Sequence, residues 1–186
     1  MRSFIFFFIV IFSLQSLSKA DDIRDFEIEG ISVGDSLLDY FDKSELTKDY
    51  FYKSKKWAAI SKAMPSFEIY GGFQAHVKSD DPRYIIGSLE GMILYKKNFK
   101  NCYKKQKEIT MVLDEYFKNA EIKEWESAHT ADKDSISKTK QYRLKNGDIA
   151  RVTCTDWSDK MNFIDKLKVG LHTKEFDIWI NNEAYE

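Results

Sequence analysis

The chain has 186 residues, of which 43% are hydrophobic, with 29 basic and 30 acidic side chains. This near balance of charge excludes the strongly basic composition that is typical of nucleic-acid-binding proteins. The length, only two prolines and no low-complexity linker predict one folded domain with a substantial core.

The first twenty residues have the pattern of a secretory signal peptide. Arg2 supplies a positive charge, an apolar run follows over residues 4–14, and Ser18-Lys19-Ala20 is a small-x-small cleavage site. The run is shorter than the roughly 20 residues that a membrane-spanning helix needs. We therefore expect cleavage between Ala20 and Asp21 and no transmembrane segment after the signal is removed. An uncleaved anchor is the alternative.

The next part of the chain is predicted to contain a short helix and three strands. Asp35 or Ser36 can cap a helix over residues 36–46, where apolar side chains recur at helical spacing. Residues 26–31 are expected to form a short strand or an extended lead-in. Three longer segments alternate with a period of two and are predicted strands: 57–63, 67–77 with a bend at Gly71-Gly72, and 83–96.

The rest of the chain is predicted to form a long helix, four strands and a short helix. Residues 99–119 carry a broad apolar stripe, which indicates an amphipathic helix. The predicted strands are residues 121–130, 136–145, 148–156 and 167–171. Asn146-Gly147 is the strongest hairpin signal, and Thr173 is expected to cap a short helix near the C-terminus.

Strands that follow one another in runs predict the α+β class rather than a parallel sheet. We expect a single domain over residues 21–186 with an antiparallel sheet of about seven strands. One long and two short helices are expected to pack on one face of this sheet, and the polar residues within the strands predict that the other face is exposed to solvent.

Cys102 and Cys154 are the only two cysteines. An even number in an exported protein predicts a disulfide. Closing a loop of 52 residues would stabilise the fold by roughly 4 kcal/mol on chain entropy. Two buried free thiols are the alternative. A metal site is disfavoured, because there is no Cys-x-x-Cys and no histidine nearby in the sequence.

The tetrad Gly34-Asp35-Ser36-Leu37 resembles the motif that opens a class of secreted serine hydrolases. Those enzymes also carry a Gly-x-Asn-Asp element and an Asp-x-x-His near the C-terminus, and this sequence has neither. A serine nucleophile needs a base within reach and donors for the oxyanion. We therefore interpret Ser36 as a helix cap and assign no catalytic residue.

The histidines and acids form no recognisable site in the sequence. His76 is expected on the solvent-exposed face of a strand, His129 in a polar strand or loop, and His172 at a strand end. Nothing in the sequence brings two of them together. Asp132-x-Asp134 resembles the start of a calcium loop, but Ile136 occupies the place of the third oxygen ligand and no glycine follows. We predict no metal and no cofactor.

For two further groups of residues, the binding of a metal or a ligand is a weak alternative to a structural role. The acids Asp156, Asp159 and Asp165 bracket one loop and are interpreted as solvated side chains rather than metal ligands. Trp125 and Trp157 are adjacent to acids. Their expected role is packing in the core, and binding of a sugar or peptide is the alternative.

Two stretches, residues 21–41 (DDIRDFEIEGISVGDSLLDYF) and 173–185 (TKEFDIWINNEAY), resemble the start and end of small exported proteins of streamlined marine bacteria. The segments CYKKQKEI and CTDWSD resemble the same group, which has no assigned activity. The resemblance would cover most of the mature chain. It implies a Gram-negative envelope and a periplasmic location, supports the pairing of the two cysteines, and supplies no catalytic residue.

A likeness of shape concerns small envelope proteins of the BamE type and the β-lactamase-inhibitor fold. Both pack helices on one face of an antiparallel meander. They often begin with Gly-x-Ser/Thr at an early helix, as Gly34 and Ser36 do here. This likeness concerns the fold and does not fix a function.

The leading functional hypothesis is a non-enzymatic binding or envelope-accessory protein of the periplasm, with another envelope protein or a peptide as its partner. The alternative is a small periplasmic hydrolase with an unrecognised site. A hydrolase needs a concave pocket that holds a histidine with an Asp, Glu or Ser within hydrogen-bond reach. A binding protein needs an exposed apolar groove or patch.

Overall fold

The computed structural model describes residues 22–186 except residues 97 and 130. The predicted signal peptide and its cleavage site at Ala20 and Asp21 lie outside the described residues. Within the described part of the chain, no helix has the length and apolar character needed to cross a membrane.

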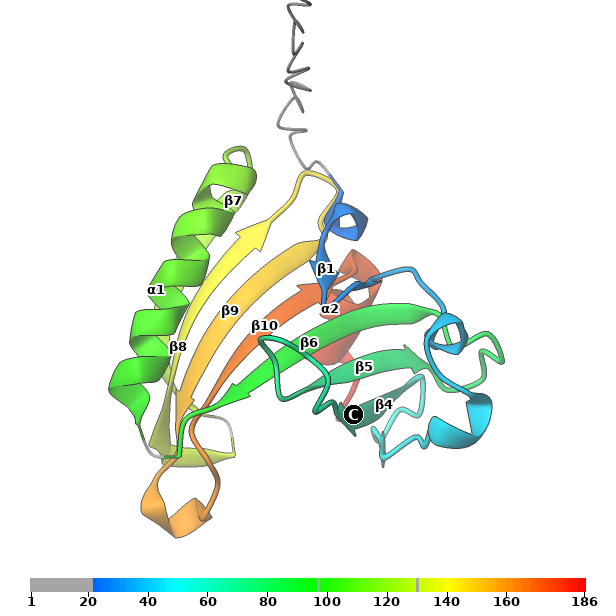
Figure 1. The fold of residues 1–186 in the computed structure, drawn as a ribbon, viewed down its shortest axis with the longest axis horizontal. Coiled ribbons are helices and arrows are strands. Elements are labelled where there is room, and N and C mark those ends of the chain that lie inside the picture. Colours follow the sequence, from blue (N-terminus) through cyan, green and yellow to red (C-terminus); the bar gives the residue numbers. More distant parts are fainter. Residues whose placement is uncertain (1–21, 97, 130) are drawn as a thin grey trace, which may run out of the picture.

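An eight-stranded antiparallel sheet forms the centre of the fold (Figure 1), with the order β3-β4-β5-β6-β10-β9-β8-β7. The strands are β3 Tyr50–Phe51, β4 Trp57–Ala63, β5 Gly72–Lys78, β6 Ile86–Leu94, β7 Glu121–His129, β8 Asp132–Arg143, β9 Ile149–Asp156 and β10 Lys166–His172. Two meanders therefore meet where β6 pairs with β10. A separate ribbon pairs β1 (Glu27–Ile28) with β2 (Ile31–Ser32). The predicted α+β class and antiparallel sheet are confirmed.

The two α-helices, α1 (Phe99–Tyr116) and α2 (Lys174–Asn182), pack on opposite faces of the sheet. Cys102 of α1 packs with Val169 of β10, whereas Phe176 of α2 stacks on His172 of the same strand. Val169 and His172 are three residues apart, so they point to opposite faces. Figure 1 shows α2 behind the sheet. The prediction that all helices share one face is wrong, because helical periodicity does not specify which face a helix covers.

The predicted helix over residues 36–46 is also wrong. The segment forms two 3₁₀ turns, Leu37–Asp39 and Lys43–Glu45, instead. It runs beside the start of β6, where the Leu37 N–H donates to the Tyr84 carbonyl at 3.1 Å and Ser36 forms a bridge with Ile85. The extended backbone at Asp42, which forms a capping box with Glu45, interrupts a continuous α-helix over this segment. Short 3₁₀ turns satisfy the remaining groups.

The strand bounds agree with the predicted ones for some strands and differ by several residues for others, such as β8, which begins at Asp132 rather than at residue 136. β4 has the predicted bounds, Trp57–Ala63, but β5 begins only at Gly72. The preceding residues form a turn in which the Met64 N–H donates to the Gly71 carbonyl at 3.0 Å. A side chain at Gly72 would place its Cβ 2.3 Å from the backbone oxygen of Lys62. Glycine is therefore required where the chain enters the strand.

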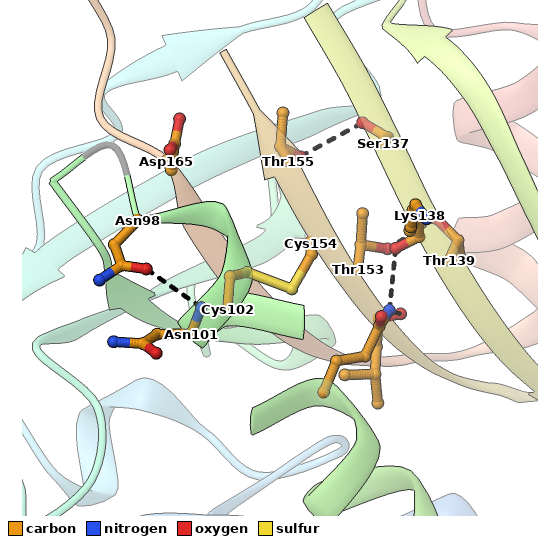
Figure 2. Close-up of a disulfide and its surroundings, with 12 residues drawn as sticks. Asn98, Asn101, Cys102, Ser137, Lys138, Thr139, Thr153, Cys154, Thr155 and Asp165 are labelled. Carbon is orange, nitrogen blue, oxygen red and sulfur yellow. Dashed lines mark hydrogen bonds between the residues drawn. A yellow bond between two sulfur atoms is a disulfide. The ribbon is translucent and has the colours of Figure 1, made fainter. Parts of the chain in front are cut away.

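A buried disulfide between Cys102 and Cys154 joins α1 to β9 (Figure 2). Both residues are fully buried, and the bridge spans 52 positions of sequence with a Cα–Cα distance of 6.0 Å. They pack with Val152, Leu167 and Val169 of the sheet. The predicted disulfide is confirmed, and it fixes the long helix to the centre of the second meander.

The start of α2 is attached to the sheet at two points. Thr173 caps the helix as predicted: its Oγ1 accepts from the Phe176 N–H at 3.2 Å and donates to the Gly87 carbonyl at 3.0 Å. Asp148, in the predicted hairpin between β8 and β9, accepts from the Lys174 N–H at 2.8 Å. Because these bonds set the position of α2 over the sheet, they also set the depth of the space beneath it.

Candidate functional site

Polar side chains form two adjacent rows on the sheet face that α2 covers. In the first row the strand register places His76 of β5 and His172 of β10 on either side of Ser88 of β6. In the second row, two residues along each strand, Glu90 of β6 lies directly opposite Gly170 of β10. Residues two apart along a strand share a face, so both rows face α2.

The first row forms a buried hydrogen-bonded chain that begins at Tyr52. The Tyr52 hydroxyl lies 2.8 Å from His76 Nε2. The Ser88 Oγ lies 3.3 Å from His76 Nδ1 and 2.8 Å from His172 Nδ1. The far nitrogen, His172 Nε2, is buried and has no hydrogen-bond partner among the described residues. Such an atom destabilises the fold by about 1–3 kcal/mol unless something binds it.

A cavity of about 200 Å³ lies between this face and α2. Its lining includes Glu90, Lys168 and His172 from the sheet and Phe176, Asp177 and Ile180 from α2. The His172 imidazole occupies the space over Gly170, since a Cβ at that position would lie 2.6 Å from His172 Nε2. Glycine is therefore required at this position for the imidazole to lie against the sheet.

The charged groups around the cavity are paired. Glu90 accepts from the Lys168 ammonium. Burial raises the pKa of Glu90, but the charge and hydrogen bond of Lys168 together with the two nearby histidines outweigh this effect, so the pKa of Glu90 lies below its ordinary value. On the helix side, the Asp177 carboxylate lies 3.2 Å from both Arg143 and Arg151. The site is a network of ionised groups rather than the apolar groove expected of a binding protein.

Burial keeps both histidines neutral. It lowers the pKa of His76 to about 4 and that of His172 to about 3, and Glu90 offsets the shift in part. At neutral pH each imidazole therefore has one N–H donor and one bare acceptor nitrogen. The row can form directed hydrogen bonds, but its imidazoles are weak bases.

The sequence-based placement is wrong for one of the three histidines. His76 is only 3% exposed, not solvent-facing, and it shares Ser88 with His172. His172 ends β10 and His129 ends the polar strand β7, as predicted, and His129 stacks on Trp157 with ring centroids 4.3 Å apart. One signal was available: Lys168, Gly170 and His172 alternate with apolar residues on one strand. The partner strand of β10 could not be read from the sequence.

Ser36 is a cap, as predicted, although of a 3₁₀ turn rather than an α-helix. Its Oγ accepts from the Leu38 N–H at 3.1 Å and donates to the Arg83 carbonyl at 2.6 Å. No histidine is a hydrogen-bond partner of Ser36 within the part of the chain that the structure describes. The tetrad therefore has a structural role in fixing the segment before β6.

Replacing Ser36 by alanine should lower the free energy of unfolding by about 1 kcal/mol, because the cap is lost. Urea unfolding monitored by far-ultraviolet circular dichroism measures this change. Ser36→Thr is the matched control, since it keeps the hydroxyl and should lose much less. An esterase activity that Ser36→Ala abolishes at unchanged stability would contradict the structural role.

The acids singled out in the sequence stabilise loops. The Asp132 carboxylate accepts from Ser135 and Ser158, each at 2.6 Å, and pairs with Lys160. The buried Asp165 accepts from the Trp157 N–H at 3.0 Å. No cluster of three or more potential metal ligands occurs within residues 22–186 with positions 97 and 130 set aside.

The two tryptophans have different environments. Trp157 is buried and packs edge-on against Phe163 with ring centroids 5.0 Å apart. Trp125 is 41% exposed on β7, which is the last strand in the sheet order. Packing therefore accounts for Trp157, and Trp125 marks the open edge of the sheet.

Comparisons of the chain with protein-family models, curated proteins and solved structures found no match. Fold and site together define the class: a disulfide-bonded α+β protein with a polar cavity between a helix and the sheet. The resemblance to small exported proteins of marine bacteria stays a prediction.

Proposed function

We propose that this is a periplasmic, non-enzymatic binding protein that takes a small polar ligand into the cavity beneath α2. The cavity of about 200 Å³ beneath α2, with charged groups of the sheet in its lining, carries the proposal. Pockets for small molecules combine a concave space with a few polar groups that fix orientation. Here Glu90, Lys168 and Arg151 are such groups.

The geometry that a hydrolase needs is present in part, since a serine and a histidine lie within hydrogen-bond reach near a cavity. Three observations favour binding instead. Ser88 is fully buried, and its hydroxyl already contacts both imidazoles. Burial holds the pKa of His172 near 3, whereas a general base works best with a pKa near the working pH. Glu90 is occupied by the Lys168 ammonium.

The periplasmic location rests on two features. The first twenty residues have the pattern of a signal peptide. The Cys102–Cys154 disulfide is the kind of bond that forms and persists in oxidising compartments. Together they support export across one membrane of a Gram-negative envelope.

The edge strand β7 supports a second candidate, the binding of an extended peptide from another envelope protein. Eight of its nine residues are exposed, and a free edge can pair with an added strand. However, Lys138 and Lys140 of β8 pair with Glu126 and Glu124 of β7 at 2.7 and 2.9 Å. Charged side chains along an edge are typical of strands that avoid such pairing, so we rank this candidate second.

Gly170→Ala should abolish ligand binding, because the new Cβ would lie 2.6 Å from His172 Nε2 and would force this imidazole of the cavity lining to move. A thermal-shift screen of the mature protein against small organic acids, amino acids, amines and sugars measures this. A ligand present at 100 times its dissociation constant stabilises the native state by about 2.7 kcal/mol. We expect at least one compound to stabilise the wild type in this way and to leave Gly170→Ala unaffected.

Gly71→Ala is the matched control. The nearest atom to its Cβ would be a backbone oxygen at an ordinary 3.9 Å, so it should bind like the wild type. A compound that stabilises the wild type and Gly170→Ala equally would place the site elsewhere. A screen in which no compound stabilises the wild type would contradict the proposed function.

A further inference from the structure

The cavity beneath α2 has hydrogen-bond acceptors on one side and donors on the other. The strand register places Gln74 of β5, Glu90 of β6, Gly170 of β10 and Arg151 of β9 in one row across the sheet. Lys168 precedes Gly170 by two residues, so it shares the face of this row. The four side chains line the cavity. The carboxylate and amide therefore belong to β5 and β6, and the two cationic groups to β9 and β10.

On the acceptor side, two oxygens remain available. Glu90 Oε2 accepts from the Lys168 ammonium, whereas Glu90 Oε1 accepts no hydrogen bond from the residues that the structure describes. Gln74 Nε2 donates to Ser61 Oγ at 3.1 Å, and Gln74 Oε1 likewise has no donor among those residues. Neither oxygen is one of the fully buried atoms without a partner, so both are accessible. A carboxylate and an amide oxygen are suitable acceptors for an ammonium group, which has only donors.

On the opposite side, donors remain available. Arg151 Nε and Nη2 donate to Gln141 Oε1 at 3.1 and 2.6 Å, and Nη2 also donates to Asp177 at 3.2 Å. Arg151 Nη1 donates to none of the described residues and is not a fully buried atom. Lys168 has two ammonium protons beyond the one that Glu90 accepts. A guanidinium and an ammonium are the donors that form strong, charge-assisted bonds to a carboxylate.

The charged side chains that line the cavity balance. Glu90 and Asp177 carry two negative charges, and Lys168 and Arg151 carry two positive charges. A ligand with a net charge would leave that charge uncompensated in a partly desolvated site, which is unfavourable. A ligand whose own two charges cancel keeps the balance. It also places a cation against the acceptors and an anion against the donors, so its charges complement those of the cavity.

We propose that the ligand is an amino acid in its zwitterionic form. Its ammonium group donates to Glu90 and Gln74. Its carboxylate accepts from Arg151 and Lys168. Its carbon atoms face the apolar side chains that α2 contributes to the lining. The cavity volume of about 200 Å³ equals that of roughly six or seven water molecules, which suits an amino acid of a few carbons. This inference rests on the proposed small-ligand function.

The test is isothermal titration calorimetry of the mature protein with glycine, L-alanine, β-alanine and γ-aminobutyrate. We expect at least one of them to bind. For that compound, N-acetylation leaves only the anion and amidation of the carboxylate leaves only the cation. Each derivative should bind about tenfold more weakly or worse, because one side of the cavity loses its charged partner. Binding of either derivative as tightly as the zwitterion would overturn the proposal.

Gln74→Leu tests the orientation of the ligand. It removes one acceptor on the ammonium side and leaves the ion pairs of Glu90 and Arg151 in place. It should weaken binding of the zwitterion by about tenfold without changing the far-ultraviolet circular dichroism spectrum. Lys123→Met is the matched control, because Lys123 lies in the same row on the exposed strand β7 but outside the cavity lining. Equal binding by Gln74→Leu and the wild type would overturn the proposal.

The thermal-shift screen separates this proposal from the proposed function. If another class of compound stabilises the wild type and no amino acid binds, the ligand class is wrong and the small-ligand function stands. If neither an amino acid nor any other screened compound binds, both are overturned.

Discussion

Breaking the Cys102–Cys154 disulfide should lower the free energy of unfolding by about 4 kcal/mol, estimated from the entropy of a 52-residue loop. That is a large part of the 5–15 kcal/mol that typically stabilises a domain. The bridge joins α1 to β9 within a buried cluster, so its loss should loosen the contact between the helix and the second meander. Urea unfolding of the oxidised mature protein and of Cys102→Ala/Cys154→Ala measures the difference.

The wild type unfolded in the presence of reductant is the control for the two substitutions. It should lose a similar amount, because reduction opens the same loop without changing a side chain in the native core. Equal urea midpoints for the oxidised and reduced proteins would contradict the stabilising role. Two alkylatable thiols in the native exported protein would contradict the bridge itself.

Acidification from pH 7.5 to pH 5 should destabilise the protein by about 4 kcal/mol, because His76 and His172 are buried in the neutral form. Burial lowers the pKa values of these histidines to about 4 and about 3, whereas an unfolded histidine has a pKa near 6.5. Between these values the unfolded state binds more protons, so stability is complete above pH 6.5 and falls as the pH falls. At pH 5 each histidine contributes a loss of about 2 kcal/mol.

Urea unfolding at half-unit steps of pH between 5 and 7.5 measures this loss. His129→Gln is the matched control: His129 is less buried, so its removal should leave most of the slope in place. Carboxylates with lowered pKa values change the free energy of unfolding mainly below pH 5, because their pKa values in the unfolded state lie near 4. A stability that stays constant from pH 7.5 to 5 would show that the two imidazoles are not buried in the neutral form.

The sequence predicted those helices and strands whose signal lies within their own segment. The period of two located β4, and the helical stripe located α1 to within three residues of its C-terminal end, because each signal lies within its own segment. Residues 36–46 carry a helical spacing too, but their start pairs with Tyr84 and Ile85 and the extended backbone at Asp42 divides the segment. A tertiary pairing overrode the local preference there, as it commonly does.

The candidate site could not be predicted from the sequence, because it also depends on contacts between segments that are far apart in the chain. Ser88 and His172 are 84 positions apart and meet only because β6 pairs with β10. Neither hairpin signals nor periodicity specify that pairing, which joins the two meanders. His76 also occurs where alternation with Ala75 and Val77 predicts a solvent-facing residue, and α2 buries that face instead. Without the position of α2, a buried polar row is indistinguishable from an exposed one.

The central claim is that the cavity beneath α2 is a ligand site. A high-resolution crystal structure of the mature protein, isolated in its exported form from cells, tests it most directly. We predict density for a small molecule within the cavity, with a polar atom within hydrogen-bond distance of Lys168 or Arg151. Density for ordered water alone in the cavity would contradict the claim.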